Sequence, residues 1–178
     1  STAPKIRAWL QLIRLPNLLT VPGDPLAGAC LALALQGSGR LAPAWPAALV
    51  ALCLYTSGLL LNDCCDLKQD RQQRPDRPLP SAAIPLTHAI GVAILLMVMA
   101  LALAFAIQPG TAAVAAVLTV MILLYNLLLK EIPVLGSLAM GLCRGLSFLL
   151  GATAVGTPAI PTGALLGVAI TLTLYIAA

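Results

Sequence analysis

Three aspartates near the middle of the chain, Asp63, Asp66 and Asp70, follow one another at spacings of three and four residues. On a helix that turns about 100° per residue they fall at about 0°, 300° and 340°, so they share one narrow face. Carboxylates this close repel one another, and their desolvation near a bilayer is costly. A divalent cation relieves both problems, and Mg²⁺ is usually held jointly by carboxylates and phosphate oxygens. The spacing therefore predicts a Mg²⁺–phosphate site with the three aspartates as metal ligands and catalytic residues.

Basic residues follow the aspartates directly. Arg74 and Arg77 each precede a proline, and their guanidinium groups are forked donors suited to phosphate. Pro75 is expected to end a helix that continues from Asn62 through the acidic residues. The prolines up to position 80 make the following stretch extended and stiff. We therefore expect the two arginines to be held over the carboxylates at little entropic cost.

The composition is that of a polytopic membrane protein. The chain is 60% hydrophobic and only 9% charged, and its mean hydropathy is +0.99, whereas soluble domains carry about 25% charged residues. The alternating ten-residue strands of a membrane barrel are absent from the sequence, which leaves an all-α helix bundle. Runs of about 20 apolar residues predict transmembrane helices. Six such spans are expected: Leu15–Leu35, Trp45–Leu61, Leu86–Ile107, Ala112–Leu129, Val134–Val155 and Pro161–Ala178.

The net charge of +4 does not indicate a nucleic-acid partner, because the basic residues lie at helix ends rather than on a soluble face. Most of them precede the first span, lie in the acidic loop or follow the fourth span, whereas Arg40 alone lies in a loop of the opposite side. This asymmetry places the N-terminus and the aspartate-rich loop in the cytoplasm. Residues 1–14 are expected to form an amphipathic helix at the membrane surface, with Arg7 and Arg14 facing lipid phosphates.

Three polar residues lie within the apolar spans. Asn17 and Asp24 are seven residues apart on one face of the first span, and Arg144 lies about eleven residues into the fifth. For Asn17, the alternatives are a helix–helix hydrogen bond and a substrate contact. For Asp24 we favour a structural role in a kink, because it lies between a glycine and a proline. An intramembrane arginine is a functional candidate, with an ion pair to Asp24 or another carboxylate as the structural alternative.

The acidic segment resembles a known motif. Residues 62–81 read N-D-x-x-D-x-x-x-D-x-x-x-R-P-x-R-P-L-P-S, which is similar to the first aspartate-rich motif of the UbiA superfamily of intramembrane prenyltransferases. The compact R-P-x-R-P spacing is closer to the geranylgeranylglycerol-phosphate synthase, chlorophyll synthase and EboC-like branches than to quinone-type members. Ala82 departs from the glycine that usually follows the serine.

The resemblance implies a nine-helix fold and Mg²⁺-dependent transfer of a polyprenyl group from a prenyl diphosphate to an aromatic or lipid-like acceptor. It implies a protein of a bacterial or archaeal plasma membrane, surrounded by lipid. Y-N-L-L-L-K, residues 125–130, resembles the family's Tyr-x-x-x-x-Lys segment, although Glu131 replaces the basic residue common there. Carried over by motif, the residues implied to bind substrate are Asn17, Asn62, Arg74, Arg77, Tyr125 and Lys130, to which the intramembrane position adds Arg144.

The resemblance covers one domain, residues 1–178, expected to be the N-terminal part of the family fold, because the second aspartate-rich motif is absent from this sequence. That absence keeps open an alternative, a non-catalytic relative that binds lipid or assists transport. A CDP-alcohol phosphotransferase also uses spaced intramembrane aspartates. It is discounted, because its motif requires D-G-x-x-A-R and this chain has D-L-K-Q-D.

Overall fold

The structure is a computed structural model that describes residues 3–37, 39–156 and 162–177. All regular elements in these ranges are helices, which confirms the all-α prediction. Five spans are long and apolar enough to cross a membrane, counting α2 with α3 and α7 with η1. The elements are α1 (Ala3–Leu12), α2 (Leu15–Leu18), α3 (Gly23–Gln36), α4 (Ala44–Cys65), α5 (Leu67–Gln73), α6 (Leu86–Ile107), α7 (Pro109–Leu124), the π-helix η1 (Tyr125–Leu129), α8 (Pro133–Val155) and α9 (Thr162–Ala177).

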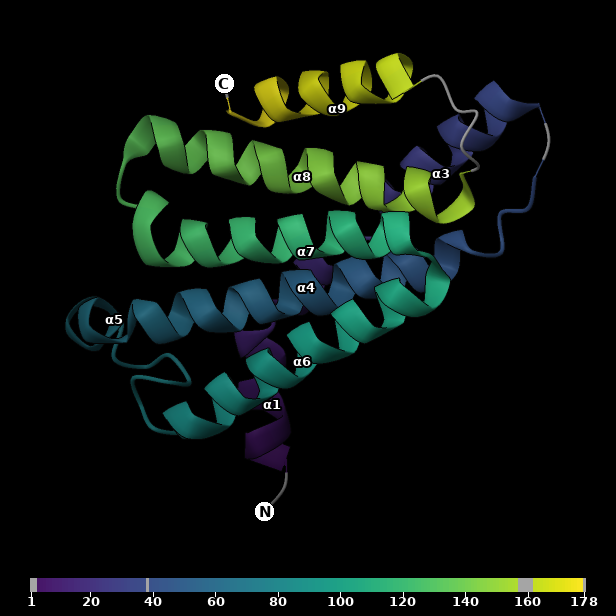
Figure 1. Cartoon of the computed structure of the whole chain (residues 1–178). Coiled ribbons are helices and arrows are strands. Elements are labelled where there is room, and N and C mark those ends of the chain that lie inside the picture. Colours follow the sequence, from purple (N-terminus) through teal and green to yellow (C-terminus); the bar gives the residue numbers. More distant parts are fainter. Residues whose placement is uncertain (1–2, 38, 157–161, 178) are drawn as a thin grey trace.

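The long helices lie side by side in a bundle in which α4 is central (Figure 1). Helix α4 packs against α3, α6, α7 and α8, and α9 packs on the outer side of α8. Val50 and Leu54 of α4, Leu118 of α7 and Leu150 of α8 belong to one buried apolar cluster. The central helix therefore carries its C-terminal end, with the aspartates, to one end of the bundle.

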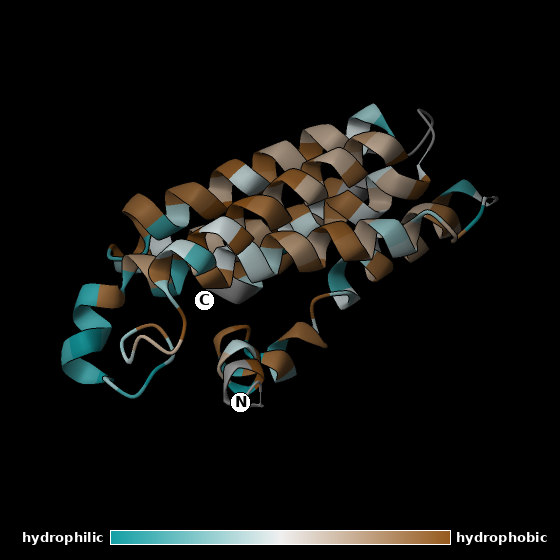
Figure 2. Ribbon diagram, turned by 90° about the horizontal axis from the view of Figure 1, so that it is seen from below, coloured by the Kyte–Doolittle hydropathy of each residue, from teal (hydrophilic) through white to brown (hydrophobic). Residues whose placement is uncertain are grey.

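Helix α6 shows why this sequence packs as a membrane bundle. Its buried face includes Ala89, Ala93 and Ala100, whereas Leu95 and Phe105 on the opposite face are exposed. Lipid tails are as apolar as leucine, so the helices gain little by burying large side chains and instead approach through small ones. Hydrophilic residues gather at the end of the bundle that holds α5 and the loop after it (Figure 2).

The predicted spans follow the same order as the observed helices, but several begin or end at different residues. The third is the same, Leu86–Ile107. The first is broken, because Pro22 ends the turn before α3 and cannot donate a backbone hydrogen bond. The second extends beyond Leu61 to Cys65 and so includes Asn62 and Asp63. The sixth is α9, a 16-residue helix, with Pro161 and Ala178 outside the described residues.

Glycines allow close contacts of α8 with α9 and with α3. A Cβ on Gly145 would lie 2.8 Å from the Ala169 carbonyl oxygen of α9, so the small residue lets α8 and α9 approach closely. A Cβ on Gly28 of α3 would lie 1.9 Å from the Phe148 oxygen, and one on Gly151 would lie 1.7 Å from the Pro25 oxygen. Helices α3 and α8 therefore touch backbone to backbone, next to Asp24.

Candidate active site

The acidic segment is not one continuous helix. Helix α4 ends at Cys65 and α5 begins at Leu67, with Asp66 in a turn between them at φ −83° and ψ 1°. Helix α5 runs at a marked angle to α4 (Figure 1). The prediction of an uninterrupted helix from Asn62 to Pro75 is therefore wrong at Asp66. The shared face inferred from 100° steps is replaced by a corner, at which the aspartates take different partners.

Asp63 and Asp70 are brought together by one arginine. A guanidinium nitrogen of Arg77 lies 2.7 Å from Asp70 Oδ2 and 4.0 Å from Asp63 Oδ1. Both aspartates are buried, at 7% and 6% exposure. Buried carboxylates need compensating charge, and here the Arg-Pro segment supplies it, as the sequence predicted.

Asp66 turns to a different side. Its Oδ1 pairs with Lys130 Nζ, and its Oδ2 accepts a 3.1 Å hydrogen bond from Asn62. Lys130 directly follows the π-helix, and its amide donates to the Tyr125 carbonyl five residues back. A π turn takes one residue more than an α turn and is frequent at functional sites. The structure thus joins the predicted Lys130 and Asn62 to the acidic segment through Asp66.

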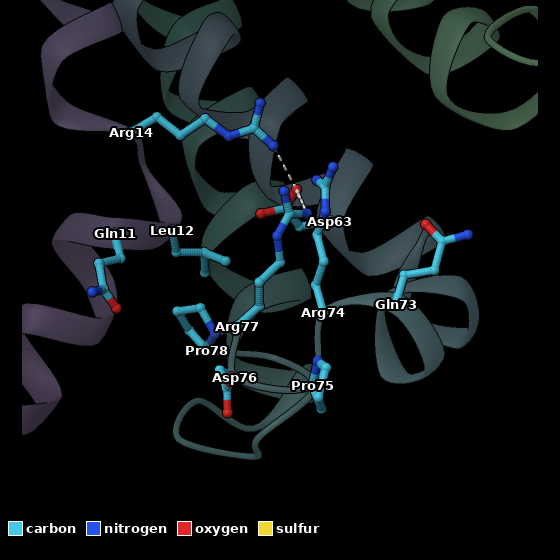
Figure 3. A pocket seen from close by; sticks show the side chains of 10 residues that line it. All are labelled: Gln11, Leu12, Arg14, Asp63, Gln73, Arg74, Pro75, Asp76, Arg77 and Pro78. Atoms are coloured by element: carbon cyan, nitrogen blue, oxygen red, sulfur yellow. Dashed lines mark hydrogen bonds and ion pairs between the residues drawn. The ribbon is translucent and has the colours of Figure 1, made fainter.

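A cavity of about 480 Å³ opens at this polar end. Figure 3 shows the side chains of Arg14, Arg74 and Arg77 directed toward Asp63, while Asp76 points away from it. Arg74 forms no ion pair within the described part of the chain, so its guanidinium remains free to donate. We call this space the loop cavity.

Arg14 is the site residue that the sequence reasoning missed. We expected it at the lipid headgroups, but its guanidinium donates to Asp63 Oδ1 at 3.0 Å. It joins α1 to α2 in the left-handed region, at φ 49° and ψ 57°, which a residue other than glycine seldom adopts. No local pattern links positions 14 and 63, so only the tertiary fold reveals the pair.

A second cavity of about 490 Å³ lies inside the bundle, and Arg14 lines both. We call it the inner cavity. Much of its wall is apolar and comes from α4 and α7. Its polar lining includes Asn17, Asn62, Tyr125, Asn126 and Arg144.

Asp24 and Arg144 meet on the wall of the inner cavity. Arg144 Nη2 donates to Asp24 Oδ1 at 2.8 Å, and its Nε pairs with Asp24 Oδ2. The ion pair that we considered for Arg144 is therefore present, and it faces a cavity. Asp24, expected to serve a kink, has this specific partner as well.

The donor set suits Mg²⁺ in type, because the buried oxygens of Asp63 and Asp70 lie beside one another, within reach of one guanidinium. Among the residues that the structure describes, no three acidic, histidine or cysteine side chains form a preassembled metal site. The assignment of the three aspartates as Mg²⁺ ligands stays a prediction, with Asp66 engaged by Lys130.

The sequence was compared with protein families and with curated proteins. The model of the UbiA prenyltransferase family matches residues 25–178. The digeranylgeranylglyceryl phosphate synthases of Methanosarcina mazei and Ignicoccus hospitalis are each 32% identical, over 161 and 150 residues. The matches cover 85% and 84% of this chain, but 56% and 48% of the relatives. The chain thus spans about half the length of these curated relatives.

Solved structures share the fold. A structure described as giving insight into digeranylgeranylglyceryl phosphate synthase in membranes superposes with a TM-score of 0.80 at 24% identity, over 97% of this chain and 58% of that one. A UbiA homologue from Archaeoglobus fulgidus, bound to DMAPP and Mg²⁺, superposes with a TM-score of 0.78 at 18% identity, over 95% and 60%. The all-helical bundle, the motif order and the match over most of the sequence agree, and this integral membrane chain belongs to the UbiA prenyltransferase family.

Proposed function

We propose that the protein is a Mg²⁺-dependent intramembrane prenyltransferase that uses a prenyl diphosphate as donor. One observation carries the proposal: Arg14, Arg74 and Arg77 converge on a buried carboxylate at the polar end of the bundle, and Arg14 also lines the largely apolar inner cavity. A diphosphate needs clustered forked donors, and a polyisoprenoid tail needs apolar walls. Arg14 lines both spaces, and we propose that a single ligand spans them.

Different residues of the chain have different roles in this proposal. Arg74, Arg77 and Arg14 donate to diphosphate oxygens, and Lys130 adds a cation beside Asp66. Bound Mg²⁺, held by Asp63, Asp66 and Asp70, supplies charge neutralisation of the leaving diphosphate. Asn17, Asn62 and Tyr125 line the inner cavity, where they orient the first carbons of the prenyl chain. The surrounding helices exclude water from the allylic carbon.

The relatives' name suggests the acceptor class. A digeranylgeranylglyceryl phosphate synthase, by that name, makes a glyceryl phosphate that carries two geranylgeranyl groups. We propose that the acceptor here is a lipid-like alcohol of this kind. The positive-inside asymmetry supports a cytoplasmic N-terminus and aspartate-rich loop. The diphosphate of the donor and the polar head group of the acceptor would then both enter from the cytoplasm.

Diphosphate release from a radiolabelled prenyl diphosphate, with and without Mg²⁺, tests the proposal in the native full-length protein. Arg74→Gln is the informative variant, because Arg74 forms no ion pair in the described residues and its loss leaves no carboxylate newly unpaired. A hydrogen bond to a charged group contributes about 1.5–3 kcal/mol, so we expect kcat/KM to fall by about 10- to 100-fold. The matched control is Arg71→Gln, an exposed arginine of α5 outside the loop cavity.

Binding without release would favour the non-catalytic alternative. A specific observation makes this outcome worth testing: Asp63, Asp66 and Asp70 all have cationic partners within the protein itself. Their charges are therefore already compensated without a metal. Equal activity of the Arg74 and Arg71 variants, or release that does not depend on Mg²⁺, would defeat the proposal.

A further inference from the structure

The Asp24–Arg144 pair lies apart from the loop cavity and takes no part in the proposed diphosphate site. Asp24 lies in the first turn of α3, and Arg144 is midway along α8. The Asp24 side chain is 12% exposed and the Arg144 side chain 47%. Both line the inner cavity, which also reaches Asn62 and Tyr125. A ligand held by this pair therefore shares a cavity with the prenyl chain of the proposed donor.

The two helices have other close contacts besides this pair. The glycine contacts at Gly28 and Gly151 already bring α3 and α8 into backbone contact beside it. An ion pair removed from water contributes little net stability, because desolvation offsets the attraction. Ionisable groups inside a membrane protein usually serve a ligand or a proton. The location of Asp24 and Arg144 on a cavity wall agrees with such a role.

Two side chains on the wall of the inner cavity keep hydrogen-bond acceptor capacity. Arg144 uses one lone pair on each Asp24 oxygen, and a carboxylate offers about four. Asn126 is 3% exposed, and its Nδ2 donates to the carbonyls of Ile122 at 2.9 Å and Gly58 at 3.4 Å. Its Oδ1 is buried and has no hydrogen-bond partner in the described residues. The remaining lone pairs of Asp24 can accept a hydrogen bond from an O–H group of a ligand in the cavity.

The charges on the cavity wall also favour an uncharged ligand with a hydroxyl group. Asp24 and Arg144 together are neutral, and Arg14, the other charged residue of the lining, is paired with Asp63, so this part of the wall offers no unpaired cation to an anion. A carboxylate ligand would have to displace Asp24 from Arg144 and leave it unpaired, which is strongly unfavourable in a low-dielectric site. An uncharged hydroxyl can instead donate to Asp24 while the ion pair stays intact.

We propose that the Asp24–Arg144 pair binds the acceptor's reacting hydroxyl as an uncharged alcohol, an inference that rests on the proposed prenyl-transfer function. Arg144 orients the carboxylate, and Asp24 accepts the hydroxyl's hydrogen bond. In transfer, the hydroxyl oxygen forms a bond to carbon 1 of the prenyl group. The bond from that carbon to the diphosphate breaks, and its electron pair leaves with the diphosphate. The hydroxyl proton passes to Asp24.

The test compares acceptors and variants in the native full-length protein at saturating prenyl diphosphate and Mg²⁺. The acceptor probes are a 1-O-alkylglycerol, its 3-phosphate and 4-hydroxybenzoate. We expect transfer to an alkylglycerol and not to the benzoate. Comparing transfer to the alkylglycerol with transfer to its 3-phosphate shows whether the hydroxyl is recognised alone or whether the phosphate adds binding at another place. Preference for the benzoate overturns the inference, and this comparison needs no variant.

Asp24→Asn retains a hydrogen-bond acceptor but cannot take the proton. Removing a general base costs about 10²–10⁴-fold, so we expect transfer to fall at least 100-fold while prenyl diphosphate affinity changes less than twofold. Thr171→Val is the control, because this exposed threonine of α9 bonds only to its own helix among the described residues. The exchange Asp24→Arg with Arg144→Asp restores the ion pair but reverses its direction. If transfer is restored in that double variant, or if Asp24→Asn retains full transfer, the pair serves only to hold the helices in place and the inference is overturned. If the unaltered protein binds no prenyl diphosphate, the proposed function itself has failed.

Discussion

Substituting Gly151 by alanine tests the helix contact that positions the inner cavity. The new Cβ would lie 1.7 Å from the Pro25 carbonyl oxygen, where ordinary contact begins at 3.4 Å. The backbones of α3 and α8 must therefore separate by about 1.7 Å, because a carbonyl cannot rotate away as a side chain can. Overpacking of this kind costs about 1–3 kcal/mol, and we expect the free energy of unfolding in mixed SDS micelles to fall by at least that amount.

The same separation reaches the site, since Pro25 directly follows Asp24. An added 1.7 Å would stretch the 2.8 Å bond between Asp24 and Arg144 beyond hydrogen-bonding distance. Gly91→Ala is the matched control, because nothing lies within 4 Å of its Cβ position on α6. Alanine in a helix interior is better than glycine by about 0.5–1 kcal/mol, so the control should be neutral or stabilising. Equal unfolding free energies for the two variants would refute the backbone contact.

Three further substitutions probe the site. Lys130→Met removes the partner of Asp66, and we expect at least tenfold weaker prenyl diphosphate binding by calorimetry, because a charged hydrogen bond contributes about 1.5–3 kcal/mol. Arg14→Gln should weaken that binding similarly while changing the unfolding free energy by less than about 1 kcal/mol, since its pair with Asp63 is 38% exposed on the arginine side. Asn126→Ala should lower the unfolding free energy by about 1–2 kcal/mol, because it removes the hydrogen bonds to the carbonyls of Ile122 and Gly58; an unchanged value would contradict the bonds described.

Much of the fold could be predicted from hydropathy, because a helix is the cheapest way to satisfy backbone groups in lipid. The span Leu86–Ile107 is correct to the residue. The break before α3 and the turn at Asp66 could not be placed as well. A proline indicates that a helix breaks but does not fix the geometry of the break. At position 66 the aspartate is itself compatible with a helix, so the sequence gives no sign of the turn there.

The site was predicted in part for a related reason. Local spacing linked Asp70 to Arg77, seven residues away, and the motif supplied the rest. Contacts such as Arg14 with Asp63 join positions 49 residues apart, and Asn126 with Gly58 joins positions 68 apart. Such pairs depend on how helices cross, which single-sequence periodicity does not encode.

The central claim is that buried aspartates and converging arginines hold a Mg²⁺–diphosphate. Calorimetric titration of geranyl diphosphate into the native protein, with and without Mg²⁺, tests it most directly. We predict at least tenfold tighter binding with Mg²⁺, the loss of that gain in the double variant Asp63→Asn, Asp70→Asn, and its retention in Glu131→Gln, an exposed acid near the same end. Binding that is equally tight without Mg²⁺, or a gain that survives in the double variant, would contradict the claim.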